Sequence, residues 1–270
     1  RTWPASGPCD VDRLALQSSG CPPITPTNSS LWRWDEDRGQ FDLVQSLLTH
    51  GTNAAEAFVI DGQHYLAVAN AHRNVSDSIA EGVVNSTVYR WDTATAQFMP
   101  LQNILTHSAL DVKHWKIGLD HYLGFANSAI FSAQQWCPVF RWTGREFAPY
   151  QNLTDTAGAT GLEPFSVGGD SFLAVANRLC PKTGHLCNST IYRWNASQLW
   201  ERHQIVESHG AYDWEFFCTK TERCYLALAN HIDRHANKSF PCDVDSVIYQ
   251  YNPTSKMFDP WQNLKTQGAE

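Results

Sequence analysis

Residues 65–70 read Tyr-Leu-Ala-Val-Ala-Asn, and residues 88–91, a short way on, read Val-Tyr-Arg-Trp. Both phrases recur in the same order along the chain. The first returns at 122–127, 172–177 and 225–230, and the second has counterparts at 31–34, 139–142, 191–194 and 248–251. A spacing of roughly 50 to 60 residues suits one small β-sheet per repeat. The sequence therefore predicts an array of similar sheets.

One repeat can be divided into four strands. Residues 57–60 are apolar and are followed by Asp61-Gly62, a strong hairpin-turn dipeptide, before residues 65–70 resume with strand formers. Residues 86–91 alternate between polar and apolar, and 98–102 form a weaker strand whose Pro100 suits a sheet edge. Four antiparallel strands of decreasing apolarity are typical of a β-propeller blade.

The remaining repeats follow the same order. Complete units are expected at 57–105, 114–153, 164–206 and 215–263, whereas 31–48 holds only the last two strands of a unit. The missing inner strands of that blade should lie in residues 1–30, where Arg13–Gln17 is the candidate. We predict an all-β fold, a single five-bladed propeller with an irregular first blade. Its parts are an N-terminal segment, 1–30, and a repeat propeller, 31–270.

The repeated aromatic and basic positions of the tetrads have expected roles. Packing between blades is predicted for the tryptophans, and local stacking or pairing for the arginines on the other sheet face. These residues are Trp34, Trp91, Trp142 and Trp194, and Arg33, Arg90, Arg141 and Arg193.

The composition of the chain limits the classes of partner that it could bind. The 270 residues are 43% hydrophobic and 17% charged, which is sufficient for a substantial core. The formal charge of −7 and the absence of a basic run argue against nucleic acid or an anionic membrane. No apolar run is long enough to span a bilayer. Proteins, glycans, cations and small molecules remain as partners.

Eight cysteines accompany seven glycosylation sequons, a combination that favours a secreted, oxidised glycoprotein. The sequons begin at Asn28, Asn74, Asn85, Asn152, Asn188, Asn195 and Asn237. The first residue is Arg1 and no apolar leader follows, so we expect a mature or trimmed chain. Spacing suggests disulfides between Cys180 and Cys187 and between Cys218 and Cys224. Three pairings remain open for Cys9, Cys21, Cys137 and Cys242, which could tie the N-terminal segment to the last blade.

These repeats resemble the EAR, or EPTP, repeats of the leucine-rich glioma-inactivated proteins and of the thrombospondin-type laminin G/EAR proteins. The phrases at 65–70 and 191–194 and the ending at 147–153 carry the resemblance, which extends over roughly residues 31–265. It implies an extracellular β-propeller used for protein recognition, sometimes with a cation in the central channel. Familiar members carry seven repeats, whereas this chain shows about five.

Candidate site residues fall in the segments between the expected strands. Five carboxylates are expected in or beside the inter-blade connections and could offer oxygen ligands to calcium: Glu56, Asp111, Glu163, Asp213 and Glu215. His50, His107 and His209 share one repeat position, where they could form a metal or proton-transfer cluster or, as we favour, fix turns. Ligand contacts are expected from the start of the next loops, at Asn70, His72, Asn127, Asn177, Asn230 and His231.

No catalytic, nucleotide-binding or metal-binding sequence motif occurs. The leading hypothesis is a secreted recognition module for a protein or glycan, with calcium as a possible channel ion. The alternative is a secreted enzyme at the channel mouth. Its acid, base or metal-ligating groups would be His50, His107, His209, Asp111, Asp213 and Glu215.

Overall fold

The computed structural model describes residues 27–71, 83–128, 136–232 and 242–270. All regular structure in these residues is β. The strands are β1 (Thr27–Asp35), β2 (Gln40–Thr49), β3 (Thr52–Ile60), β4 (Gln63–Asn70), β5 (Val83–Asp92), β6 (Gln97–His107), β7 (Ala109–Ile117), β8 (Asp120–Asn127), β9 (Cys137–Trp142), β10 (Phe147–Leu153), β11 (Ala159–Val167), β12 (Asp170–Asn177), β13 (Ser189–Trp194), β14 (Trp200–Val206), β15 (Ala211–Cys218), β16 (Cys224–Asn230), β17 (Asp243–Tyr251) and β18 (Phe258–Gln267). None of the described segments is a helix of the length and apolarity that crossing a membrane demands.

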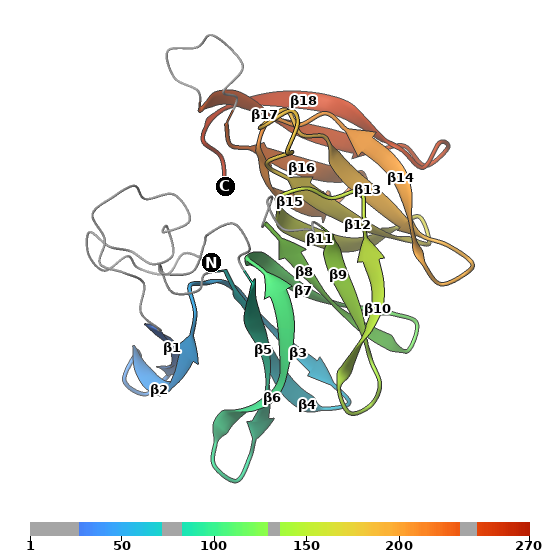
Figure 1. Ribbon diagram of the computed structural model, residues 1–270. Helices are drawn as coiled ribbons and strands as arrows, with labels where there is room; N and C mark the ends of the chain where they lie inside the picture. Colours follow the sequence, from blue (N-terminus) through green and yellow to red (C-terminus); the bar gives the residue numbers. More distant parts are fainter. Residues whose placement is uncertain (1–26, 72–82, 129–135, 233–241) are drawn as a thin grey trace.

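Four consecutive antiparallel sheets form the body of the molecule: β3–β6, β7–β10, β11–β14 and β15–β18 (Figure 1). In each one the first strand is innermost, and β7 packs against both β3 and β11, while β11 also packs against β15. Radial sheets whose inner strands meet about an axis make a β-propeller, as predicted. The tetrads form the third strand of each sheet, and the Leu-Ala-Val-Ala-Asn-like phrases form the second.

Within the described residues, the blade at the start of the chain consists of β1 and β2. Its candidate inner strand, Arg13–Gln17, lies outside the described residues. The five-blade count and the division at residue 30 therefore stay predictions. Figure 1 shows the two ends of the array, blue β1–β2 and red β17–β18, standing apart from each other.

Local sequence explains the hairpins. Asp61 and Gly62 join β3 to β4 with φ of 49° and 79°, which is the pair of positive angles that a tight type I′ turn needs. Gly168 and Gly169 hold the matching turn between β11 and β12, with φ of 61° and 81°. Because such turns match the twist of the strands, they set the register of each inner pair.

Inner strands begin earlier than the sequence suggested, at Thr52, Ala109, Ala159 and Ala211. All four carry a register shift, or β-bulge, just after this first residue. The first and third residues of each of these strands are small or polar, and most of them are not strong strand formers.

A glutamine on the last strand joins each blade to the next. Its amide donates to a backbone carbonyl and accepts from the backbone N–H of the same aromatic residue in the neighbouring blade, over 2.7 to 2.9 Å. The pairs are Gln45 with Phe98, Gln102 with Phe147, Gln151 with Trp200, and Gln204 with Phe258. We call this two-bond contact the glutamine clasp.

Aromatic rings fill the space between blades. Trp142 packs on Tyr65 and Trp194 on Tyr122, each from the neighbouring blade, with ring centroids 5.4 and 5.3 Å apart. The predicted packing role is confirmed for these two tryptophans. Arginine pairing is also local where predicted, since Arg193 donates to Asp170 over 2.7 Å, and Arg141 pairs in the same way with Asp120.

Both predicted disulfides, Cys180–Cys187 and Cys218–Cys224, are formed. Within the described residues Cys137 and Cys242 are free thiols, while Cys9 and Cys21 lie outside them. The pairing of these four stays open. Of the sequons, Asn74 and Asn237 are outside the described ranges. Asn28, Asn85, Asn152 and Asn188 are exposed, whereas half-buried Asn195 accepts two backbone N–H bonds in its own turn.

Candidate functional site

The predicted carboxylates lie within the inner strands, not in the connections where the sequence placed them. Their pairing with the second strands defines two levels along the axis. At one level stand Glu56, Lys113, Glu163 and Glu215, opposite Ala67, Gly124, Ala174 and Ala227. Two residues earlier, at the other level, stand Ala54, Asp111, Gly161 and Asp213. Alternation in a strand puts both levels on one face.

We call Glu56, Asp111, Lys113, Glu163, Asp213 and Glu215 the axial cluster. Backbone N–H groups of neighbouring blades hold two of its carboxylates. Asp111 accepts from the N–H of Leu162 over 2.9 Å, and Glu163 accepts from the N–H of Phe216 over 3.2 Å. These bonds cross from blade to blade, so the carboxylates both join neighbouring inner strands and keep fixed positions.

Gly161 gives Asp213 its place. A Cβ on Gly161 would stand 2.5 Å from Asp213 Oδ1 and 3.0 Å from the carbonyl oxygen of Tyr212. Neither atom is the end of a long flexible chain, so any larger residue would push β11 and β15 apart. In the space that the absence of a Cβ leaves, the Asp213 carboxylate accepts a hydrogen bond from the N–H of Trp214 over 2.9 Å.

Burial sets the protonation of the cluster. It raises the pKa of Glu163 to about 7 and that of Asp213 to about 6, and neighbouring carboxylates add to both shifts. Burial also raises the pKa of Glu56 and Asp111. For Lys113 burial works to lower the pKa, but Asp111, Asp213, Glu163 and Glu56 outweigh it and the pKa ends above its ordinary value. The lysine is therefore a permanent cation among weakened acids.

Glu163 provides a pH-dependent prediction. Its folded-state pKa lies above the unfolded value of 4.5, so the cost of its charge is complete above about pH 7, shrinks as the pH falls below 7, and disappears only below 4.5. We expect Glu163→Gln to be more stable than the wild type at pH 8, by on the order of 1–2 kcal/mol, and equally stable at about pH 4. Urea unfolding at both pH values measures this difference. Exposed Glu146→Gln is the control, and a gain that persists undiminished at about pH 4 would contradict the assignment.

Lys113 was not among the predicted site residues, because that unit was expected to begin at residue 114. The signal was present, since Asp111 and Lys113 are separated by two residues, as side chains on one face of a strand are. A charged pair at this spacing inside an otherwise apolar strand could have indicated a polar axis.

The axial cluster does not fit the calcium ion suggested by the resemblance. Calcium takes six to eight oxygen ligands, but at the level of Glu56, Glu163 and Glu215 the fourth inner strand carries Lys113, an ammonium. Within the described ranges no group of three or more His, Cys, Asp and Glu side chains is arranged to hold a metal ion. The five carboxylates lie on neighbouring inner strands, and a lysine stands among them.

The three histidines share a backbone role. The N–H groups of His50, His107 and His209 each donate to an asparagine side chain that ends the second strand of the blade. In the blade β11–β14 the N–H of Ala157 makes the same bond, so the imidazole is not needed for it. This arrangement agrees with the turn-fixing interpretation.

The asparagines are those acceptors. Asn70, Asn127, Asn177 and Asn230 are buried, and each side chain also donates to a backbone carbonyl near the start of the third strand. Their amides hold the two loops of a blade together, which corrects the expectation that they face a ligand. His231 is likewise buried, 3.8 Å from the Glu270 carboxylate, and burial lowers its pKa. His72 lies outside the described residues.

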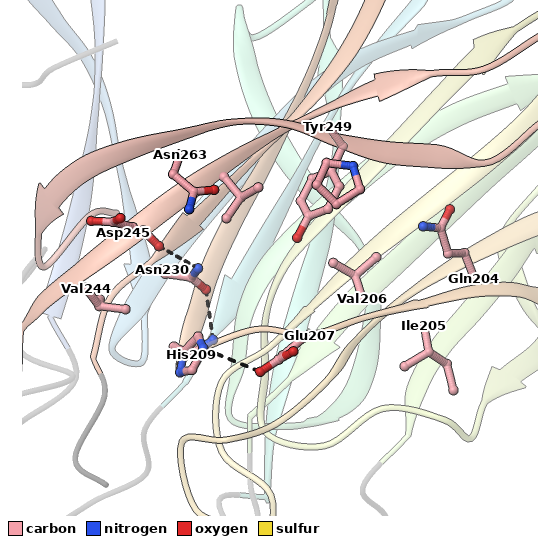
Figure 2. Close-up of a pocket in the computed structure, with 12 residues that line it drawn as sticks. Gln204, Ile205, Val206, Glu207, His209, Asn230, Val244, Asp245, Tyr249 and Asn263 are labelled. Carbon is pink, nitrogen blue, oxygen red and sulfur yellow. Dashed lines mark hydrogen bonds and ion pairs between the residues drawn. The ribbon is translucent and has the colours of Figure 1, made fainter. Parts of the chain in front are cut away.

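A pocket lies between β14 and the strands β17 and β18, away from the axial cluster. This pocket of about 600 Å³ is lined by Val206, Glu207, His209, Asp245 and Tyr249, among others. Figure 2 shows His209 bonded to Asn230 and near Glu207, whose carboxylate is 3.9 Å from the imidazole. The pocket is lined by one of the predicted histidines, His209, and does not include the axial carboxylates.

Comparison with known proteins gives a consistent result. A sequence profile described as the EPTP domain matches residues 40–92, 97–142 and 146–195. The thrombospondin-type laminin G domain and EAR repeat-containing protein of Homo sapiens is 38% identical over 199 residues, 72% of this chain and 28% of that protein. The Mus musculus protein of the same name is 30% identical over 263 residues, 75% of this chain and 38% of that one.

Leucine-rich repeat LGI family member 3 of Macaca fascicularis is 26% identical over 207 residues, 62% of this chain and 35% of its own. This chain thus spans between 28% and 38% of the length of these relatives. Among solved structures, a periplasmic gluconolactonase of Pseudomonas aeruginosa superimposes with a TM-score of 0.57 at 16% identity, covering 91% of this chain and 66% of that one. At that identity the likeness concerns the fold alone.

Proposed function

The chain belongs to the EPTP domain family, and from this premise we propose that it is a secreted β-propeller that recognises an extracellular protein. The two disulfides support an oxidising compartment, and the exposed sequons support glycosylation. The observation that carries the proposal is the state of the two end faces of the blade array.

The leading face belongs to β1–β2 and carries four exposed apolar side chains, Trp32, Trp34, Phe41 and Leu43. They form two cross-strand pairs on one side of the sheet. Phe41 is 61% exposed, whereas the matching Phe147, Trp200 and Phe258 are at most 4% exposed because a complete preceding blade covers them. Phe98, which follows the two-stranded β1–β2, is half-buried. A contiguous apolar patch of this kind is typical of a protein contact.

The trailing face belongs to β15–β18 and is the other half of the same joint. Leu264 is 38% exposed, whereas Leu47, Ile104, Leu153 and Val206 at its repeat position are 1 to 5% exposed. Phe217 is exposed as well, and Gln262 stands on the exposed surface at the position of the clasp glutamines. Side chains that are buried between blades elsewhere in the array are therefore exposed to solvent on this face.

A partner that fits these faces is a protein with an apolar strand surface. Toward Gln262 it would offer a main-chain N–H and C=O, and toward Phe41 and Trp34 an apolar surface that excludes water. A glycan is the less suitable ligand, because these faces carry an aliphatic leucine and aromatic side chains whose counterparts in other blades are buried. We propose no enzymatic activity, although the channel-mouth enzyme stays the alternative prediction.

Aspartate substitutions test the proposal. We expect Phe41→Asp and Leu264→Asp to abolish capture of a protein that the wild type enriches from extracellular medium, because a charge would be buried in the contact. Leu119→Asp, an exposed leucine in the β7–β8 turn, should leave capture unchanged. Quantitative mass spectrometry of the four samples measures this.

Capture that survives both end-face substitutions would show that recognition uses another surface. Binding to a glycan array, unaffected by the same substitutions, would favour the glycan alternative. Circular dichroism of each variant confirms that the blades are folded.

A further inference from the structure

Lys113 occupies a position that carries glutamate in three other blades. Glu56, Glu163 and Glu215 stand at the same level of the inner strands, as their pairing with the second strands shows. A repeat that places acids around an axis must balance their charges, because like charges at close range repel strongly in a partly buried site. In this chain, the residue at this level in strand β7 is the positively charged Lys113.

The surrounding groups are positioned to use that positive charge. Asp111 and Glu163 are fixed at the axis by N–H groups of the neighbouring blade. Asp111, Asp213, Glu163 and Glu56 together hold the pKa of Lys113 above its ordinary value. The attraction is therefore spread over β3, β7, β11 and β15.

We infer that the Lys113 ammonium is the built-in cation of this propeller axis and takes the role that a divalent metal ion would have there. A metal ion and an ammonium at the same level would compete for one set of oxygens. The tethered charge needs no ion from solution, so the inner strands hold together whether or not calcium is present. The end-face contact described above does not depend on this inference.

The same geometry indicates what a substitution would create. Lys113→Glu would place a fourth glutamate at the level of Glu56, Glu163 and Glu215. The carboxylates of Asp111 and Asp213 lie two residues earlier on their strands. Oxygen ligands in this number suit calcium, which tolerates irregular geometry. Without calcium the additional charge should destabilise the axis. Lys113→Met would remove the cation without providing a ligand.

Thermal unfolding of the intact chain in 5 mM calcium chloride and in EGTA tests the inference. We expect the wild-type melting temperature to agree within about 1 °C between the two conditions. Lys113→Met should melt about 3–6 °C lower in both conditions, and Lys113→Glu should melt lower in EGTA and recover by about 3–6 °C in calcium. Lys116→Met and Lys116→Glu are the matched controls, because Lys116 is an exposed lysine on the same strand.

Calcium stabilisation of the wild type by several degrees would overturn the inference, since the axis would then hold a metal ion beside the lysine. So would a Lys113→Met protein as stable as Lys116→Met. If Lys113→Glu does not fold, these two comparisons still decide. Capture by the end faces, measured on the same proteins, separates a failure here from a failure of the proposed recognition function.

Discussion

Phe147→Ala is expected to lower the free energy of unfolding by about 3–5 kcal/mol. The side chain is 1% exposed and packs edge-on to Phe58 of the neighbouring blade and tilted on Trp142, with ring centroids 5.9 and 5.0 Å apart. Truncation removes these contacts and leaves a cavity that the paired strands β9 and β10 cannot close. Urea unfolding followed by tryptophan fluorescence measures the loss.

The repeat supplies an internal control for this prediction. Phe41 occupies the same position in β1–β2 but is 61% exposed, so Phe41→Ala should cost less than about 1 kcal/mol. The two substitutions delete the same atoms at equivalent places in a blade. Equal losses would mean that the leading face is covered in solution and would remove the basis of the proposed recognition surface.

Gln204→Ala is expected to cost about 2–4 kcal/mol, far more than its side-chain area suggests. The amide donates to the Phe258 carbonyl over 2.8 Å and accepts from the Phe258 N–H over 2.9 Å. Both main-chain groups belong to a fully buried residue, so deletion leaves a donor and an acceptor without partners away from water. The joint between blades β11–β14 and β15–β18 should weaken most.

Gln262→Ala is the matched control for the clasp. Gln262 stands at the same position of β18 and is exposed, so its removal should change stability by less than about 0.5 kcal/mol. Chemical unfolding of both variants gives the comparison, and Gln204→Glu, which keeps one acceptor but cannot donate, should fall between them. If Gln204→Ala is as mild as Gln262→Ala, the glutamine clasp is not a source of stability.

Much of the fold was readable from the sequence because its signals are local. The alternation in residues 86–91 and the Asp61-Gly62 turn specify strands and hairpins through neighbours in the chain, and the structure confirms them. Cys218 and Cys224 were predicted to pair because they flank one hairpin turn, and they do. The inner-strand starts were misplaced because their small and polar residues resemble loops when the axis is not in view.

The candidate site was only partly predictable. Its five carboxylates were named, but Lys113 was missed, and the four asparagines were assigned to a ligand although their amides are committed to backbone groups within each blade. A repeated polar residue can serve either the fold or a ligand, and sequence gives both uses the same pattern. Burial and bonding partners distinguish them.

By itself the sequence determined that this chain is an array of four-stranded blades of the EPTP type, since strand period, turn residues and repeat spacing are properties of contiguous segments. The tertiary structure decided which charges meet at the axis, which glutamine clasps a neighbouring blade and, among the described residues, which repeated side chains are exposed at the two ends of the array. Those outcomes depend on residues about fifty positions apart and on whether a neighbouring blade is present. Equivalent side chains such as Leu153 and Leu264 can therefore be buried in one blade and exposed in another.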